Sequence, residues 1–82
     1  MLNKQVGVIR NQDGYFVNMR QIKGGHYYTL YNGITTGFTF YENKKTMDND
    51  LKILGEGFYT EYISLKDIPD GIRISTNKIN KI

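Results

Sequence analysis

The stretch His26-Tyr27-Tyr28-Thr29-Leu30-Tyr31-Asn32-Gly33-Ile34-Thr35-Thr36-Gly37-Phe38-Thr39-Phe40-Tyr41 decides the fold that the sequence predicts. Two runs rich in aromatic and β-branched residues, the types favoured in strands, meet at Asn32-Gly33. Asn-Gly accepts the positive φ angles of a type I′ turn, so the stretch predicts a two-residue β-hairpin. This turn would set the register and pair Tyr31 with Ile34, Thr29 with Thr36, Tyr27 with Phe38 and Gly25 with Phe40.

That register gives the predicted hairpin two different faces, because cross-strand partners lie on the same side of a sheet. We expect the core on the face that carries Tyr27, Tyr31, Ile34, Phe38 and Phe40. The other face carries His26, Tyr28 and Leu30, with Tyr41 beyond the hairpin. It is the less apolar face, and we expect any function to lie there.

The residues before this stretch predict a second hairpin. Residues 4–10 alternate, residues 11–14 (Asn-Gln-Asp-Gly) have the composition of a turn, and residues 15–22 predict a strand. A four-residue loop pairs Val8 with Val17 and Val6 with Met19. Either this loop or a tighter Asp-Gly turn places the same residues on the core side: Val6, Val8, Tyr15, Val17 and Met19. The glycines at 24 and 25 predict a bend or bulge before the central hairpin.

The second half of the chain predicts less regular structure. Residues 42–50 are polar and predict a surface loop. Residues 48–55 favour a one- or two-turn helix capped by Thr46 or Asp48, and a short inward-alternating strand is the alternative.

Two further strands are expected towards the C-terminus. Residues 57–63 predict one strand, and residues 72–75 predict another with Ile72 and Ile74 pointing inward. Residues 76–82 either extend this last strand or form a basic tail.

Length and composition define the class of protein. A chain of 82 residues with no cysteine and no alanine, but with many strand-forming residues, predicts one small β domain over residues 1–75. The expected fold is all-β: a small antiparallel barrel or half-open roll of five to six strands, of SH3-like or OB-like size, with at most one short helical turn.

The sequence offers little for catalysis or metal binding. His26 is the only histidine, and cysteine is absent. Residues 48–50 (Asp-Asn-Asp) begin like a calcium loop, but Lys52 occupies a ligand position and Ile53 the position of the required glycine. We expect no enzyme activity, no metal and no cofactor. No apolar run is long enough to span a membrane, and the N-terminus has no signal-peptide core, so we expect a cytoplasmic protein without membrane contact.

The seven tyrosines suggest a binding surface, because tyrosine is favoured where one side of a residue is buried and the other is wet. Tyr28, His26 and Tyr41 would form a flat platform on the less apolar face, with Arg20 and Lys23 beside it. The alternative is structural: Tyr28 would lie across Gly37 and shield the backbone.

Two classes of partner fit such a platform. We expect a non-catalytic protein-binding regulator or inhibitor, of a kind that phages and mobile elements encode, which uses the tyrosines and an open strand edge. The same edge would also allow a homodimer. The alternative is binding of single-stranded or duplex nucleic acid, with bases on the aromatic rings and phosphates on Arg20 and Lys23.

Overall fold

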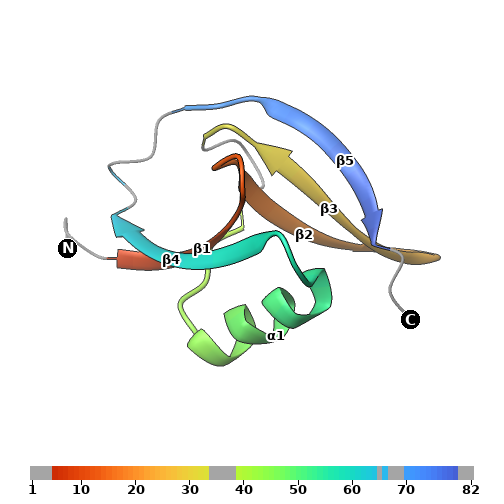
Figure 1. Cartoon of the computed structure of the whole chain (residues 1–82), viewed down its shortest axis with the longest axis horizontal. Coiled ribbons are helices and arrows are strands. Elements are labelled where there is room, and N and C mark those ends of the chain that lie inside the picture. The colour runs from red at the N-terminus through yellow and green to blue at the C-terminus, as the bar shows by residue number, and fades with distance from the viewer. Residues whose placement is uncertain (1–4, 34–38, 65, 67–69, 80–82) are drawn as a thin grey trace.

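Five antiparallel strands form a strongly bent sheet with one helix against it (Figure 1). The computed structural model describes residues 5–33, 39–64, 66 and 70–79. Its elements are β1 (Gln5–Asn11), β2 (Phe16–Ile22), β3 (Gly25–Tyr31), α1 (Lys44–Leu54), β4 (Phe58–Ser64) and β5 (Arg73–Ile79). The sheet does not close into a barrel. The expected small all-β, half-open roll is therefore confirmed.

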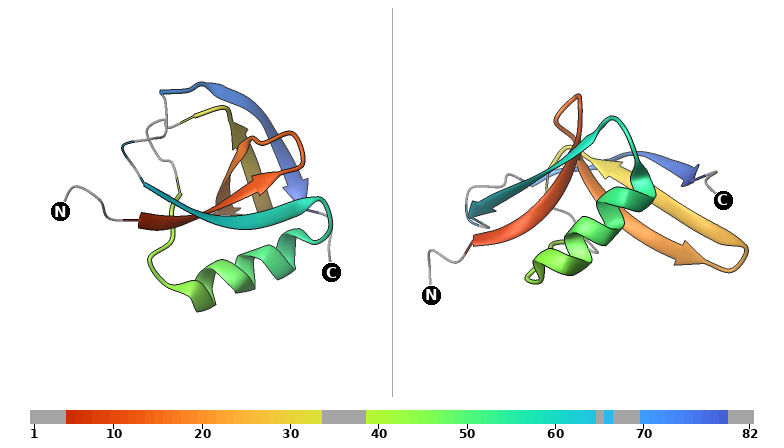
Figure 2. Two further views of the ribbon diagram at one scale, coloured as in Figure 1. Left: turned by 60° about the vertical axis from the view of Figure 1, so that its left-hand side comes forward. Right: turned by 60° about the horizontal axis from the view of Figure 1, so that its bottom comes forward.

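The sheet has the strand order β4-β1-β2-β3-β5 and bends between β1 and β2. The pairs β1–β4 and β2–β3 are registered along their whole lengths. In contrast, β1 and β2 are registered only at Arg10 and Phe16, close to the loop that joins them. Beyond this point the two strands diverge, so the sheet has two halves that turn away from each other (Figure 2).

Tyr41 fills the gap where β1 and β2 diverge. The Gly7 amide donates to the Tyr41 carbonyl at 2.7 Å, and the Tyr41 amide donates to the Gly7 carbonyl at 2.8 Å. The other edge of Gly7 is paired with Tyr62 of β4, so Tyr41 lies on the edge of β1 that faces β2. This short bridge supplies backbone hydrogen bonds that β2 does not make there.

Helix α1 covers one face of the sheet beneath β1 and β4 (Figure 2). Met47 and Leu54 are buried in a cluster with Ile9, Val17 and Tyr41. The helix begins four residues earlier than predicted because the Asn43 side chain caps it, accepting from the amides of Lys45 at 2.8 Å and Thr46 at 3.3 Å. It ends at Leu54, and Gly55, with φ 87°, follows as its C-cap. The surface loop predicted over residues 42–50 is thus wrong from residue 44 onward, and the predicted caps are wrong too.

The opposite face of the sheet holds a second cluster of Val6, Val8, Phe16 and Ile63. The predicted grouping of Val6 and Val8 with Val17 and Met19 is wrong. Arg10 faces Phe16, so the loop has five residues, and the register differs by one from the prediction. The loop is held by the Asn11 side chain, which accepts from the amides of Asp13 at 3.0 Å and Tyr15 at 2.9 Å. A shift of one residue moves a strand's side chains to the other face.

The predicted Asn32-Gly33 hairpin is also wrong. Thr29 is paired with Asn18 of β2 on one edge and with Thr76 of β5 on the other, which leaves no edge for Thr36. Asn32 does not have the positive φ that a type I′ turn needs. Its side chain instead accepts from the Ile72 amide at 2.8 Å. Residues 34–38, which include the other expected partners, lie outside the described residues.

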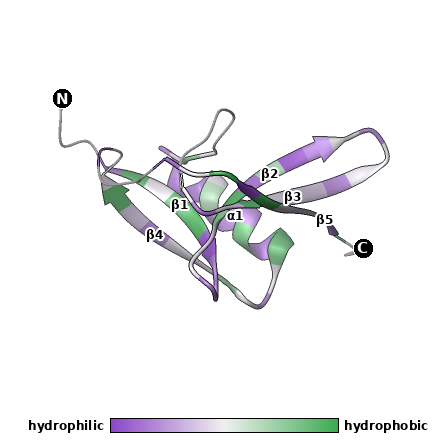
Figure 3. Ribbon diagram, turned by 90° about the horizontal axis from the view of Figure 1, so that it is seen from above, coloured by the Kyte–Doolittle hydropathy of each residue, from purple (hydrophilic) through white to green (hydrophobic). Residues whose placement is uncertain are grey.

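A two-residue hairpin turn occurs one connection earlier, at Lys23-Gly24. Ile22 is paired with Gly25, and Gly24 has φ 98°. The predicted bend at this point is therefore a tight turn, and a β2–β3 hairpin projects beyond the helix (Figure 2). Figure 3 shows hydrophilic residues at the projecting end of this hairpin and hydrophobic residues within β1 and β4.

Residues 76–82 were expected either to extend the last strand or to form a basic tail. Strand β5 continues to Ile79, so residues 76–79 extend the strand. Ile72 and Ile74 are 66% and 42% exposed, so the expectation that both point inward is wrong. The register of β3 and β5 shifts between Leu30 and Tyr31, which interrupts the alternation near Ile74. Among the described residues, no helix has the length and apolar character needed to cross a membrane.

Candidate functional site

The predicted tyrosine platform is not formed as an exposed surface. Tyr41 is only 6% exposed and donates its hydroxyl hydrogen to Asp50 at 2.6 Å. Burial and the adjacent Asp50 carboxylate raise the pKa of the Tyr41 hydroxyl far above its usual value. Tyr28 is half-buried and meets the ring of Phe58 edge-on, with centroids 5.3 Å apart. Tyr28 thus packs against Phe58, while Gly37, the partner that the structural alternative predicted, lies outside the described residues.

The other predicted site residues are separated from one another. His26 is exposed and faces Gln21 across the ladder, on the side of the sheet that carries Tyr28. Arg20 is the next residue along β2 and points to the opposite side. Lys23 is exposed in the hairpin turn between these two sides. The sequence thus identified exposed polar residues correctly but combined residues from two faces.

The structure brings a different set of side chains together on the face that carries Arg20. Arg20 is registered with Tyr27, and Tyr27 is registered with Lys78 on its other edge. Cross-strand partners share a face, so these three side chains form a line across β2, β3 and β5. Arg20 and Lys78 are exposed, and Tyr27 between them is half-exposed.

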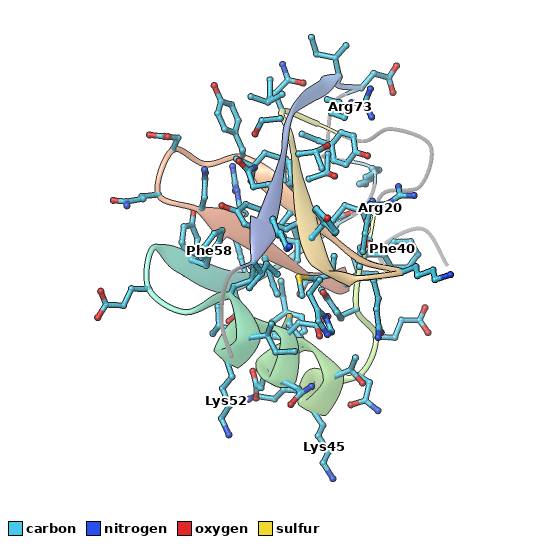
Figure 4. The ribbon with its side chains drawn as sticks, turned by 90° about the vertical axis from the view of Figure 1, so that its right-hand side faces the viewer. Arg20, Phe40, Lys45, Lys52, Phe58 and Arg73 are labelled. Carbon is cyan, nitrogen blue, oxygen red and sulfur yellow. The ribbon has the colours of Figure 1, made fainter. Side chains whose placement is uncertain are left out.

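Phe40 extends this line beyond β2. Tyr41 points towards the helix, so the preceding side chain points to the opposite face. Phe40 is 43% exposed, which is unusual for so large an apolar side chain. Figure 4 shows Phe40 and Arg20 together on one side of the molecule. We call these four residues the aromatic–cation row: Phe40, Arg20, Tyr27 and Lys78.

Gly25 provides space for two members of the row. A Cβ atom at this position would lie 3.4 Å from Lys78 Cε and 3.9 Å from Tyr27 Cε1. The lysine stem and the tyrosine ring therefore both lie over the Gly25 backbone. This arrangement leaves a flat aromatic surface with a cation next to it.

The half of the sheet that carries the row is purely basic. Strands β2, β3 and β5 contain Arg20, Arg73 and Lys78 but no aspartate or glutamate. Among the carboxylates on other elements, Glu61 pairs with Arg10 at 2.8 Å and Asp50 accepts from the Tyr41 hydroxyl at 2.6 Å. The row thus presents positive charge that no carboxylate on its own strands neutralises.

Sequence reasoning missed Tyr27, Phe40 and Lys78 because it placed Tyr27 and Phe40 on the core face. A usable signal was present at Lys23-Gly24. Had these two residues been taken as the turn, Ile22 would face Gly25, and Arg20 would then face Tyr27.

The row combines two kinds of chemical group. Its groups are two aromatic rings, a guanidinium and an ammonium, which provide stacking surfaces and positive charge. Within the described residues, no group of three or more histidine and carboxylate side chains is arranged to hold a metal ion. Comparison with protein-family models, curated proteins and solved structures finds no match to this chain.

Proposed function

We propose that this protein binds single-stranded nucleic acid through the aromatic–cation row. The observation that carries the proposal is the line of Arg20, Tyr27 and Lys78 across β2, β3 and β5, with the exposed ring of Phe40 on the same side as Arg20 (Figure 4). Proteins that bind single strands combine aromatic rings, on which bases stack, with cations that follow the phosphates. The net charge of +3 agrees with a polyanionic ligand.

A single strand fits the row better than a duplex does. In a duplex the bases are already stacked on one another, so the exposed rings of the protein could contact a base only if neighbouring base pairs were unstacked. In a single strand each base has a free π-face, and both Phe40 and Tyr27 present a ring next to a cation. The expected preference is therefore for single strands of mixed sequence.

Fluorescence anisotropy with mixed-sequence single-stranded oligonucleotides at two salt concentrations tests the proposal. The double variant Arg20→Gln with Lys78→Gln should weaken binding and reduce the logarithmic salt slope by about 1.4, because each phosphate contact on a single strand contributes about 0.7. The matched control is Lys45→Gln with Lys52→Gln. It removes the same charge from the outer side of α1, which points away from the row (Figure 4).

The aromatic half of the row has its own control. Tyr27→Ser and Phe40→Ser should each cost about 1–3 kcal/mol of binding free energy through lost stacking. Tyr59→Ser removes a ring that is similarly exposed, at 45%, but lies on β4. The proposal would be contradicted if Tyr59→Ser and Tyr27→Ser lost equal binding free energy. It would also be contradicted if the two double variants, at Arg20 with Lys78 and at Lys45 with Lys52, had equal salt slopes.

A protein partner is the second candidate function, and the outer edge of β5 favours it. This strand is the last in the sheet order, and Ile72 and Ile74 are exposed at its start. Its charged residues, Arg73 and Lys78, are both cationic, so the edge suits an extended acidic segment that adds a strand. The measurement is capture of proteins from nuclease-treated lysate by the parent protein and by Ile74→Glu.

This second function predicts capture that nuclease does not abolish and that Ile74→Glu removes. The expected homodimer would use an open edge in the same way, and sedimentation of the pure protein detects it. Absence of oligonucleotide binding at low salt, together with such capture, would put the protein partner first.

A further inference from the structure

Phe40 is 43% exposed, yet the next residue, Tyr41, is held by several contacts. Tyr41 makes two backbone hydrogen bonds with Gly7, at 2.7 and 2.8 Å. Its ring is buried in the core cluster, and its hydroxyl donates to Asp50 Oδ2 at 2.6 Å. The backbone, the ring and the hydroxyl of Tyr41 are thus each held in place.

The orientation of Tyr41 determines that of Phe40. Successive side chains of an extended segment point to opposite sides, so Phe40 leaves the backbone towards Arg20 when Tyr41 points into the core. Phe40 is 43% exposed, so burial alone does not fix its ring. The direction of the Phe40 ring therefore depends on how Tyr41 is held.

Asp50 is itself held by the helix. It lies between Met47 and Leu54, which are both buried against the sheet. The helix is capped by Asn43, two residues after Tyr41, so the segment from Phe40 to the helix is fixed at both ends. Helix α1 is therefore a rigid support for the end of the aromatic–cation row.

We propose that Asp50 is a positioning residue for Phe40, and that it acts through the Tyr41 hydroxyl to hold the ring ready for a base. This inference rests on the proposed function. A ring that is held before binding loses less conformational freedom on binding. Removing the Asp50 acceptor should therefore weaken binding of a single strand although Asp50 itself touches no ligand.

A double-mutant cycle with a fluorescent single-stranded oligonucleotide tests the proposal. Asp50→Ala should weaken binding about two- to tenfold relative to Asp50→Asn. The asparagine variant is the matched control because it loses the same charge and keeps an oxygen that accepts the Tyr41 hydrogen bond. In a Phe40→Ala background the difference between the two Asp50 variants should disappear, because there is no ring left to position.

Tyr41→Phe and an optical probe complete the experiment. Tyr41→Phe removes the donor of the same hydrogen bond and should weaken binding as much as Asp50→Ala is expected to. It keeps the proposal testable if Asp50→Ala fails to fold. The indole introduced by Phe40→Trp should show lower steady-state fluorescence anisotropy when combined with Asp50→Ala than with Asp50→Asn, without any oligonucleotide. If the role of Asp50 is purely structural, Asp50→Ala should lower thermal stability, but the fluorescence anisotropy in the folded protein should be the same with Asp50→Ala and with Asp50→Asn.

The possible failures differ from one another. If Phe40→Ala weakens binding but the two Asp50 variants bind equally, the positioning role is wrong and the proposed function stands. The same holds if the effects of Asp50→Ala and Phe40→Ala are additive. If Phe40→Ala binds as tightly as the parent, the stacking role of Phe40 is wrong, and the positioning role falls with it.

Discussion

The guanidinium of Arg10 lies over the ring of Phe16, with its Cζ atom 4.6 Å from the ring centroid, at the cross-strand pair where β1 and β2 meet. The same side chain donates to Glu61 of β4 at 2.8 Å and to the Gly14 carbonyl at 3.1 Å. One arginine therefore connects three strands and a loop where the sheet bends.

Arg10→Lys should destabilise the fold by about 1–2 kcal/mol, because an ammonium on a flexible stem cannot stack flat on Phe16 while it also reaches Glu61 and Gly14. Urea denaturation measures the change. Lys44→Gln is the control, since the Lys44–Asp48 pair is exposed and such pairs contribute little. An equal effect of the two substitutions would show that Arg10 acts only as a surface charge.

Gly7→Ala should also destabilise the protein. A Cβ atom here would lie 2.5 Å from Met47 Sδ and 3.4 Å from the Tyr41 carbonyl oxygen. Met47 is 1% exposed and has little space to move into, so we expect a loss of about 1–3 kcal/mol in urea denaturation. Gly7→Ala should cost less stability in a Met47→Val background than in the parent, because the shorter side chain leaves room for the new Cβ atom. An equal cost in both backgrounds would contradict the collision with Met47.

Gly71→Ala should be at least as damaging as Gly7→Ala. A Cβ atom at Gly71 would overlap the backbone of Gly33 and the side chain of Asn32, and backbone atoms yield less than a methionine side chain. The expected loss is about 3 kcal/mol or more. Gly25→Ala is the control, because the nearest atom there is at ordinary contact distance. Similar melting temperatures for both variants would disprove the close approach of the two glycines.

The pH dependence of stability should reveal the buried Tyr41 hydroxyl. Its pKa is raised in the folded protein, chiefly by burial, from the usual value of 10.0. Above about pH 10 the unfolded chain loses this proton and the folded chain keeps it, so stability falls as the pH rises. The difference in unfolding free energy between the parent and Tyr41→Phe should shrink by about 1.4 kcal/mol between about pH 9 and about pH 11. A constant difference would mean that Tyr41 ionises freely.

Local patterns predicted most strands but not how they pair. Alternation located β1, β2, β3 and β4, because a strand's inward and outward positions are visible in its own residues. The partners of β3 depend on competition with distant segments. Strand β5, more than forty residues away, takes the edge that the Asn32-Gly33 hairpin would have used, as in the pairing of Thr29 with Thr76.

The helix was underestimated for a similar reason. Met47, Leu51 and Leu54 have the spacing of one helical face, but the charged residues among them favoured a loop. The candidate site shares Arg20 with the predicted platform, and both combine aromatic rings with cations. Tyr31 is buried, as expected, but Tyr27 is half-exposed and Tyr41 is buried, because face assignments depend on registers that only the tertiary structure fixes.

Strand β1 lies inside the sheet although it is the earliest described strand of the chain. Its ladder with β4 runs from Gln5 opposite Ser64 to Asn11 opposite Phe58, so it closes only after the chain has been synthesised as far as Ser64. Until then Val6, Val8 and Ile9, each at most 1% exposed in the folded protein, have no complete cover. Contacts between such distant residues form slowly. Strand β1 therefore waits for a distant partner while the chain is made, and this interval is when β1 is most exposed to aggregation.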